Sequence, residues 1–166
     1  MSKGNMKYLG LAALIVCGFA TTAFAQGAAT NCLVVKQAAE VEQIDADAQG
    51  KKTTKLAPLA TATPGTEVIY TTTATNNCKK SADAVSINNF VPEHMHYVPS
   101  SVFSPGAQVE FSLDGKTFGP ADQLSVTENG AARKARAEEI RFFRWTFQSS
   151  LQPGASAFAR FRAVLN

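Results

Sequence analysis

Few residues in this sequence could do chemistry, and the clearest are two histidines in one short segment. His94 and His96 follow Glu93, and residues two apart in an extended segment point to the same face, so both imidazoles could reach one metal ion. Two ligands do not complete a site, and the sequence has no third histidine. We favour a solvated loop between strands and keep His94 and His96 as weak metal candidates.

A second candidate for cation binding is the acidic segment around Asp45 and Asp47. It begins like a calcium-binding loop, but its twelfth position is Leu56, where an EF-hand needs a bidentate glutamate. This excludes an EF-hand. A looser calcium site at Asp45 and Asp47 stays open beside the alternative of a polar loop.

Signatures of catalysis are missing from the sequence. It contains no G-x-S-x-G elbow and no phosphate-binding loop, and its two histidines lie in the same segment, away from any serine and aspartate set. We therefore expect a protein that is not an enzyme and that needs no cofactor.

The N-terminus, residues 1–25, is typical of a secretory signal peptide. Lys3 and Lys7 precede an apolar run over residues 9–20, which is too short to span a membrane comfortably. Small residues at positions 23 and 25 match the pattern that a signal peptidase reads. Cleavage would leave residues 26–166, the length of one domain.

Cleavage also changes the charge of the chain. The full sequence has 16 basic and 13 acidic residues, a net charge of +3, and removing Lys3 and Lys7 lowers this to +1. The bulk charge therefore gives no reason to expect nucleic-acid binding. We expect a secreted, periplasmic or cell-surface protein with no transmembrane segment after cleavage.

Two cysteines remain after cleavage, Cys32 and Cys78. In an oxidising compartment an even number of cysteines indicates a disulfide. If the strand that Cys32 opens pairs antiparallel with the strand that ends before Cys78, the two side chains become neighbours. An intramolecular bridge is the favoured interpretation, and an intersubunit bridge or free thiols are the alternatives.

The pattern of strands and turns predicts an all-β fold. Turn residues recur every 8–12 residues or so, and no amphipathic helix separates the strands, which favours an immunoglobulin-like antiparallel sandwich of about seven or eight strands. Residues 40–63 are expected to form a long connection with at most a weak strand near 55–59, and residues 129–139 a solvated loop or one helical turn. The expected strands cover residues 32–36, 67–75, 84–90, 97–98, 108–113, 116–118, 140–147 and 157–165, with Asp114-Gly115 as a two-residue hairpin turn.

Aromatic and basic residues are the remaining candidates for a binding surface. Alternation places Phe143, Trp145, Phe147 and Phe161 inward, so core packing is favoured over an aromatic platform. The basic residues form a cluster and a possible stripe on one sheet, which could contact an anionic envelope surface, although solubility and edge protection are favoured. The cluster is Arg133, Lys134 and Arg136, and the stripe is Arg144, Arg160 and Arg162.

Five motifs, in order along residues 33–165, resemble the bacterial and archaeal surface "conserved repeat domain" family, also called domain of unknown function eleven. They are Pro64-Gly65 followed by Tyr70 and Asn76, the segment from Val85 through Pro92 to Tyr97-Val98, Asp114-Gly115, the strand around Trp145, and Pro153-Gly154. The resemblance implies an immunoglobulin-like sandwich on an exported protein, with no catalytic residues. The sequence holds a single copy of the unit.

Together these features predict an exported structural or adhesive protein of the envelope or extracellular space. Partners are expected to be proteins, including further copies joined by β-strand addition through an N-terminal arm, residues 26–33. The alternative is a soluble secreted or periplasmic module that binds a carbohydrate, a metal or an envelope partner.

Overall fold

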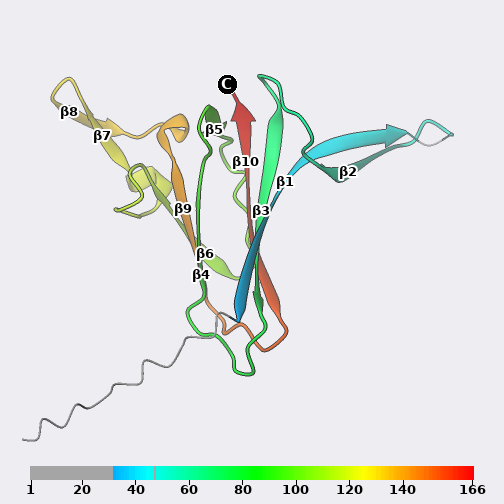
Figure 1. Cartoon of the computed structure of the whole chain (residues 1–166). Helices are drawn as coiled ribbons and strands as arrows, with labels where there is room; N and C mark the ends of the chain where they lie inside the picture. Colours follow the sequence, from blue (N-terminus) through cyan, green and yellow to red (C-terminus); the bar gives the residue numbers. More distant parts are fainter. Residues whose placement is uncertain (1–31, 47) are drawn as a thin grey trace, which may run out of the picture. The chain divides into compact units, whose positions relative to one another are not determined.

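The computed structural model describes residues 32–46 and 48–166, so the predicted signal peptide and Asp47 lie outside the described residues. This part of the chain is built from antiparallel strands with two short 3-10 helices, Ala121–Gln123 and Ala137–Glu139 (Figure 1). The strands are β1 Leu33–Ala46, β2 Lys52–Pro58, β3 Glu67–Asn76, β4 Ser86–Phe90, β5 Met95–Tyr97, β6 Ala107–Ser112, β7 Ser125–Glu128, β8 Ala131–Lys134, β9 Phe142–Phe147 and β10 Ser156–Leu165. Within the described residues no helix is long and apolar enough to cross a membrane.

Two sheets pack face to face, as in a β-sandwich. One has the order β2-β1-β3-β10-β5, the other β4-β9-β6, and β7 and β8 form a separate hairpin. Phe143 of β9 and Phe161 of β10 meet between the sheets with ring centroids 4.7 Å apart, and both are fully buried beside Trp145. The expected inward placement of these aromatic residues is confirmed, with Phe147 half-buried against the same core.

The alternation of apolar and polar residues explains β10 well. Ala159, Phe161 and Ala163 are buried, whereas Arg160 and Arg162 lie on the opposite face of the sheet. β3 follows the same rule on its inner face but also buries Ile69 on its outer face. The basic stripe is wrong in one respect, because Arg144 lies on β9 in the other sheet.

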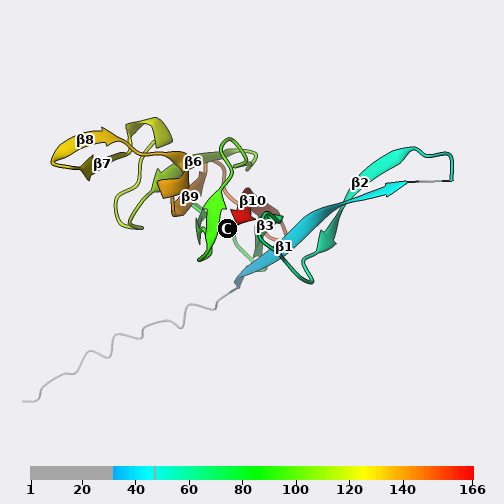
Figure 2. The same cartoon turned by 90° about the horizontal axis from the view of Figure 1, so that it is seen from above.

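The chain between residues 40 and 63 is the largest correction to the sequence-based prediction. Instead of a long connection, β1 continues to Ala46 and pairs with β2 over residues 40–46. Both views show this hairpin leaving the sandwich on one side and the β7–β8 hairpin on the other (Figure 1, Figure 2). The prediction was wrong because strands exposed on both faces carry no apolar alternation.

Two turns and one strand boundary also differ from the prediction. Asp114-Gly115 is not a two-residue hairpin, since pairing resumes only at the bridge between Phe111 and Gly119. Residues 129–139 hold β8 and a 3-10 turn, and Asn129-Gly130, both at positive φ, is the hairpin turn that joins β7 to β8. Tyr97 ends β5 rather than beginning a strand.

One end of the sandwich is held together by Asn76 and the two cysteines. The fully buried Asn76 amide donates hydrogen bonds to the carbonyls of Lys80 and Leu151, at 2.9 and 2.7 Å. Cys32 and Cys78 lie at disulfide-bonding distance, with Cα atoms 5.0 Å apart, because Leu33 pairs with Asn76. The predicted neighbourhood of the two cysteines is therefore present in the fold.

Replacing both Cys32 and Cys78 by serine is expected to lower the free energy of unfolding by about 4 kcal/mol, the chain-entropy value for a loop of this length. The sequence separation is 46 residues, so the unfolded chain gains considerable freedom when the bridge is lost. Urea unfolding of both proteins with and without reductant measures the difference. Two titratable thiols in the unreduced protein would contradict the bridge.

Candidate functional site

The projecting β1–β2 hairpin is the part of the fold that the sandwich does not explain. β1 pairs with β3 only up to Glu40, opposite Ile69, and from there to Ala46 it pairs only with β2. Six residues beyond Glu40 extend the strand by roughly 20 Å at ordinary strand rise. Nearly every residue of the hairpin from Glu42 onward is exposed.

The hairpin presents two open strand edges. In the part of the chain that the structure describes, no strand pairs with the outer edge of β2. The other open edge is that of residues 41–46, on the side where β3 pairs with the earlier part of β1. Unpaired backbone N–H and C=O groups on such edges can pair with another strand. The edges differ in charge, because β1 carries Glu42 and Asp45, whereas β2 carries Lys52 and Lys55.

One face of the hairpin carries two apolar side chains, Ile44 and Leu56, among polar neighbours. Ile44 lies opposite Thr54 and Leu56 opposite Glu42, which places Ile44 and Leu56 as diagonal neighbours on the same face. Ile44 is 67% exposed and Leu56 36% exposed. Neither side chain belongs to the hydrophobic core of the sandwich. A two-stranded ribbon by itself is only marginally stable in water.

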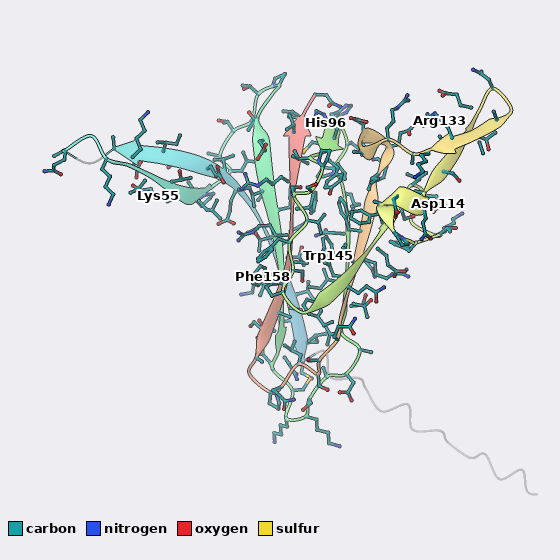
Figure 3. The ribbon with its side chains drawn as sticks, turned by 180° about the vertical axis from the view of Figure 1, so that it is seen from behind. Lys55, His96, Asp114, Arg133, Trp145 and Phe158 are labelled. Carbon is teal, nitrogen blue, oxygen red and sulfur yellow. A yellow bond between two sulfur atoms is a disulfide. The ribbon has the colours of Figure 1, made fainter. Side chains whose placement is uncertain are left out.

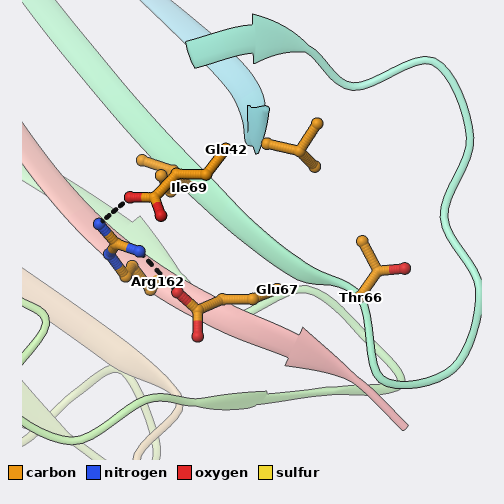
Figure 4. Close-up of a pocket in the computed structure, with 6 residues that line it drawn as sticks. Glu42, Thr66, Glu67, Ile69 and Arg162 are labelled. Atoms are coloured by element: carbon orange, nitrogen blue, oxygen red, sulfur yellow. Dashed lines mark hydrogen bonds and ion pairs between the residues drawn. The ribbon is translucent and has the colours of Figure 1, made fainter. Parts of the chain in front are cut away.

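Arg162 of β10 fixes the base of the hairpin to the sheet (Figure 4). Its guanidinium donates to Glu42 of β1 at 2.6 Å and to Glu67 of β3 at 2.7 Å. The two carboxylates raise the pKa of Arg162, so the charge is present at every accessible pH. Ile69, 1% exposed, lines the same surface pocket as Val41 and the residues of these two ion pairs.

The weak metal candidates are not brought together by the fold. Asp45 lies inside β1 opposite Thr53, and its carboxylate forms an ion pair with Lys55. His94 lies in the turn before β5 with φ at 60°, and His96 Nδ1 lies 2.7 Å from the Oδ1 of Asn166 near the C-terminal end of β10 (Figure 3). Among the described residues no three His, Cys, Asp or Glu side chains gather in a metal-binding group.

The basic cluster of the β7–β8 hairpin is largely neutralised. Arg133 donates two parallel hydrogen bonds to Glu139, both at 2.7 Å, and a third to Glu128 at 2.6 Å. The hydrogen bonds from Arg133 and from the Arg136 amide lower the pKa of Glu139 to about 2. Arg133 is therefore a poor candidate for binding an anionic ligand, because its guanidinium N–H groups already bind two carboxylates.

The sequence-based prediction missed the role of Asp114, whose side chain organises the loop after β6. Its Oδ1 accepts hydrogen bonds from the amides of Lys116 and Thr117, at 2.8 and 2.9 Å, which lower the pKa of Asp114 to about 2. An aspartate that bonds amides two and three residues ahead stabilises a wider turn than the two-residue hairpin. The Asp-Gly pair alone gives no sign of this.

Comparison of this chain with protein-family models, with curated proteins and with solved structures finds no match. The resemblance inferred from its motifs therefore stays a prediction.

Replacing Arg162 by glutamine is expected to loosen the hairpin without unfolding the sandwich, because it removes both ion pairs at the hairpin base. Each exposed ion pair contributes up to about 1 kcal/mol, so amide hydrogen exchange in residues 41–46 and 52–58 should accelerate roughly fivefold. Arg144→Gln, on the other sheet, is the control. Equal exchange rates in the two variants would show that Arg162 does not brace the hairpin.

Replacing Glu139 by glutamine is expected to reduce stability near neutral pH but not at pH 2. The pKa of Glu139 is lowered from an ordinary 4.5 to about 2, so its carboxylate stabilises the folded state above pH 4.5 and loses this effect as the pH falls toward 2. Thermal unfolding midpoints of the variant and the parent should converge over that window. Glu138→Gln, an exposed neighbour, should show no such convergence.

Proposed function

We propose that the protein is an exported, non-catalytic structural or adhesive component of the envelope or extracellular space, whose copies assemble by β-strand addition. The observation that carries this proposal is the β1–β2 hairpin, which projects from the sandwich with both edges open. An immunoglobulin-like sandwich of the resembled surface family is the architecture we infer for the domain. The cysteine pair supports export, since disulfides persist in oxidising compartments.

The hairpin needs a partner to become stable. Among the described residues, no third strand pairs with residues 41–46 or with the outer side of β2, and the side chains of Ile44 and Leu56 are exposed. Addition of a strand from another copy would pair the open backbone groups and cover these side chains.

The charges of the two edges favour a particular arrangement of copies. Two β2 edges placed side by side would bring lysines together, which protects this edge against pairing with itself. A β2 edge beside the β1 edge of the next copy avoids this repulsion, because the β1 carboxylates Glu42 and Asp45 are already paired with cations of their own chain. Such a head-to-tail contact uses two different surfaces, so it extends into a chain rather than closing as a dimer.

The double variant Ile44→Lys and Leu56→Lys is expected to abolish assembly and leave the fold intact, because both side chains are exposed and outside the core. Light scattering after size exclusion, together with electron microscopy, measures assembly of protein purified from cells expressing the full chain. Phe103→Lys is the matched control, since Phe103 is 55% exposed beside β10, outside the hairpin. A parent protein that stays monomeric at all concentrations would refute assembly.

The N-terminal arm is the competing strand donor. Leu33 already pairs with Asn76 inside the sheet, so an arm is limited to the residues before Cys32. A chain that lacks residues 26–31 keeps the whole of β1. Assembly that survives this deletion identifies the hairpin as the donor, whereas loss of assembly identifies the arm.

A further inference from the structure

The outer face of the five-stranded sheet, away from the hairpin, has an unusual composition. Strand register places its side chains in rows across β1, β3 and β10 and the segment before β6. One row is Ala38, Thr71, Arg160 and Phe103, and the next is Lys36, Thr73 and Phe158. We call the six residues other than Ala38 the Thr–Phe face. In Figure 3, Phe158 lies on the side of the sheet that faces away from Trp145.

Two phenylalanines lie together on this face. Phe103 is 55% exposed, and its ring centroid is 5.9 Å from that of Phe158 at an interplanar angle of 47°. The backbone of Phe103 is fixed, because it exchanges two hydrogen bonds of 2.9 Å with Arg160. The pair therefore forms an aromatic patch on a fixed backbone, in which Phe103 is exposed and Phe158 is half-buried, unlike the fully buried aromatic residues of the core.

The two cations of this face have no acidic partner among the described residues. Arg160 donates from Nε to the Thr71 hydroxyl at 2.9 Å, and its guanidinium lies 5.8 Å from the Phe158 ring. Across the described residues, neither Arg160 nor Lys36 forms an ion pair, and neither row contains an aspartate or glutamate. Arg162 on the same strand, by contrast, binds two carboxylates.

We propose that the Thr–Phe face binds an acidic polysaccharide, a chain of uronic-acid sugars. The C–H faces of sugar rings would stack on Phe103 and Phe158, since the negative face of an aromatic ring attracts polarised C–H groups. A uronate carboxylate would accept hydrogen bonds from the terminal N–H groups of Arg160, because the planar guanidinium matches a carboxylate in shape. A second carboxylate would lie near Lys36. The hydroxyls of Thr71 and Thr73 would bond the sugar hydroxyls.

The geometry suits an extended chain. Lys36 and Phe158 lie in one row two strands apart, which is roughly 10 Å at ordinary strand spacing, so neighbouring sugars can meet a cation and a ring together. The face has only two free cations, too few for the phosphate contacts that dominate nucleic-acid binding. This proposal does not depend on assembly through the hairpin.

Calorimetry with oligomers of polygalacturonate tests the proposal, using protein purified from cells expressing the full chain. We expect binding to polygalacturonate and none to neutral dextran. Phe103→Ala and Arg160→Gln should each weaken it by roughly tenfold, the change expected when one stacked ring or one charge-assisted hydrogen bond is lost. Thermal unfolding of each variant checks that the fold is retained.

Matched controls separate this face from general surface effects. Phe90→Ala removes a phenylalanine that is 59% exposed on the other sheet, and Lys116→Gln removes one exposed positive charge elsewhere. Both should bind like the parent protein. Equal weakening by Phe90→Ala and Phe103→Ala, equal affinity for duplex DNA, or absence of polygalacturonate binding would each overturn the proposal.

Discussion

The pairing of β3 with β1 on one side and β10 on the other is the constraint on which the rest of the structure depends. It fixes which residues face inward, so that Val68 and Ala74 join the core. It also sets the rows of the outer face, where Thr73 lies between Lys36 and Phe158 and Thr71 lies beside Arg160. A shift of one residue in either pairing would exchange these two faces.

The same pairing decides where the sandwich stops and the hairpin begins. β1 loses β3 as a neighbour at Glu40, yet it continues as a strand because β2 takes over on its other edge. Arg162 joins the three strands at this transition, since it contacts Glu42 and Glu67 from β10. Arg162 thus ties the extension to the body of the sheet at the point where β1 leaves β3.

The sequence predicted the strands that have one face buried in the core and the other exposed to solvent. β9, β10 and the inner face of β3 follow that rule, and so do the aromatic core and the proximity of Cys32 to Cys78. The projecting hairpin could not be found this way, because both of its faces are exposed. Asn129-Gly130 was a recognisable hairpin signal that the Ala-rich and Arg-rich residues after it obscured. The rows of the Thr–Phe face need the register of three strands and a distant loop, which no local pattern encodes.

The Cys32–Cys78 crosslink has a mechanical consequence. It lies where the described chain begins, at the end of β1 opposite the hairpin, and it joins that point to the loop directly after β3. Tension applied to the chain before Cys32 would enter the loop after β3 through a covalent bond and would not peel β1 away one hydrogen bond at a time. Separating the strands would then require β3 to slide past its neighbours. In this shear geometry many backbone hydrogen bonds must break together.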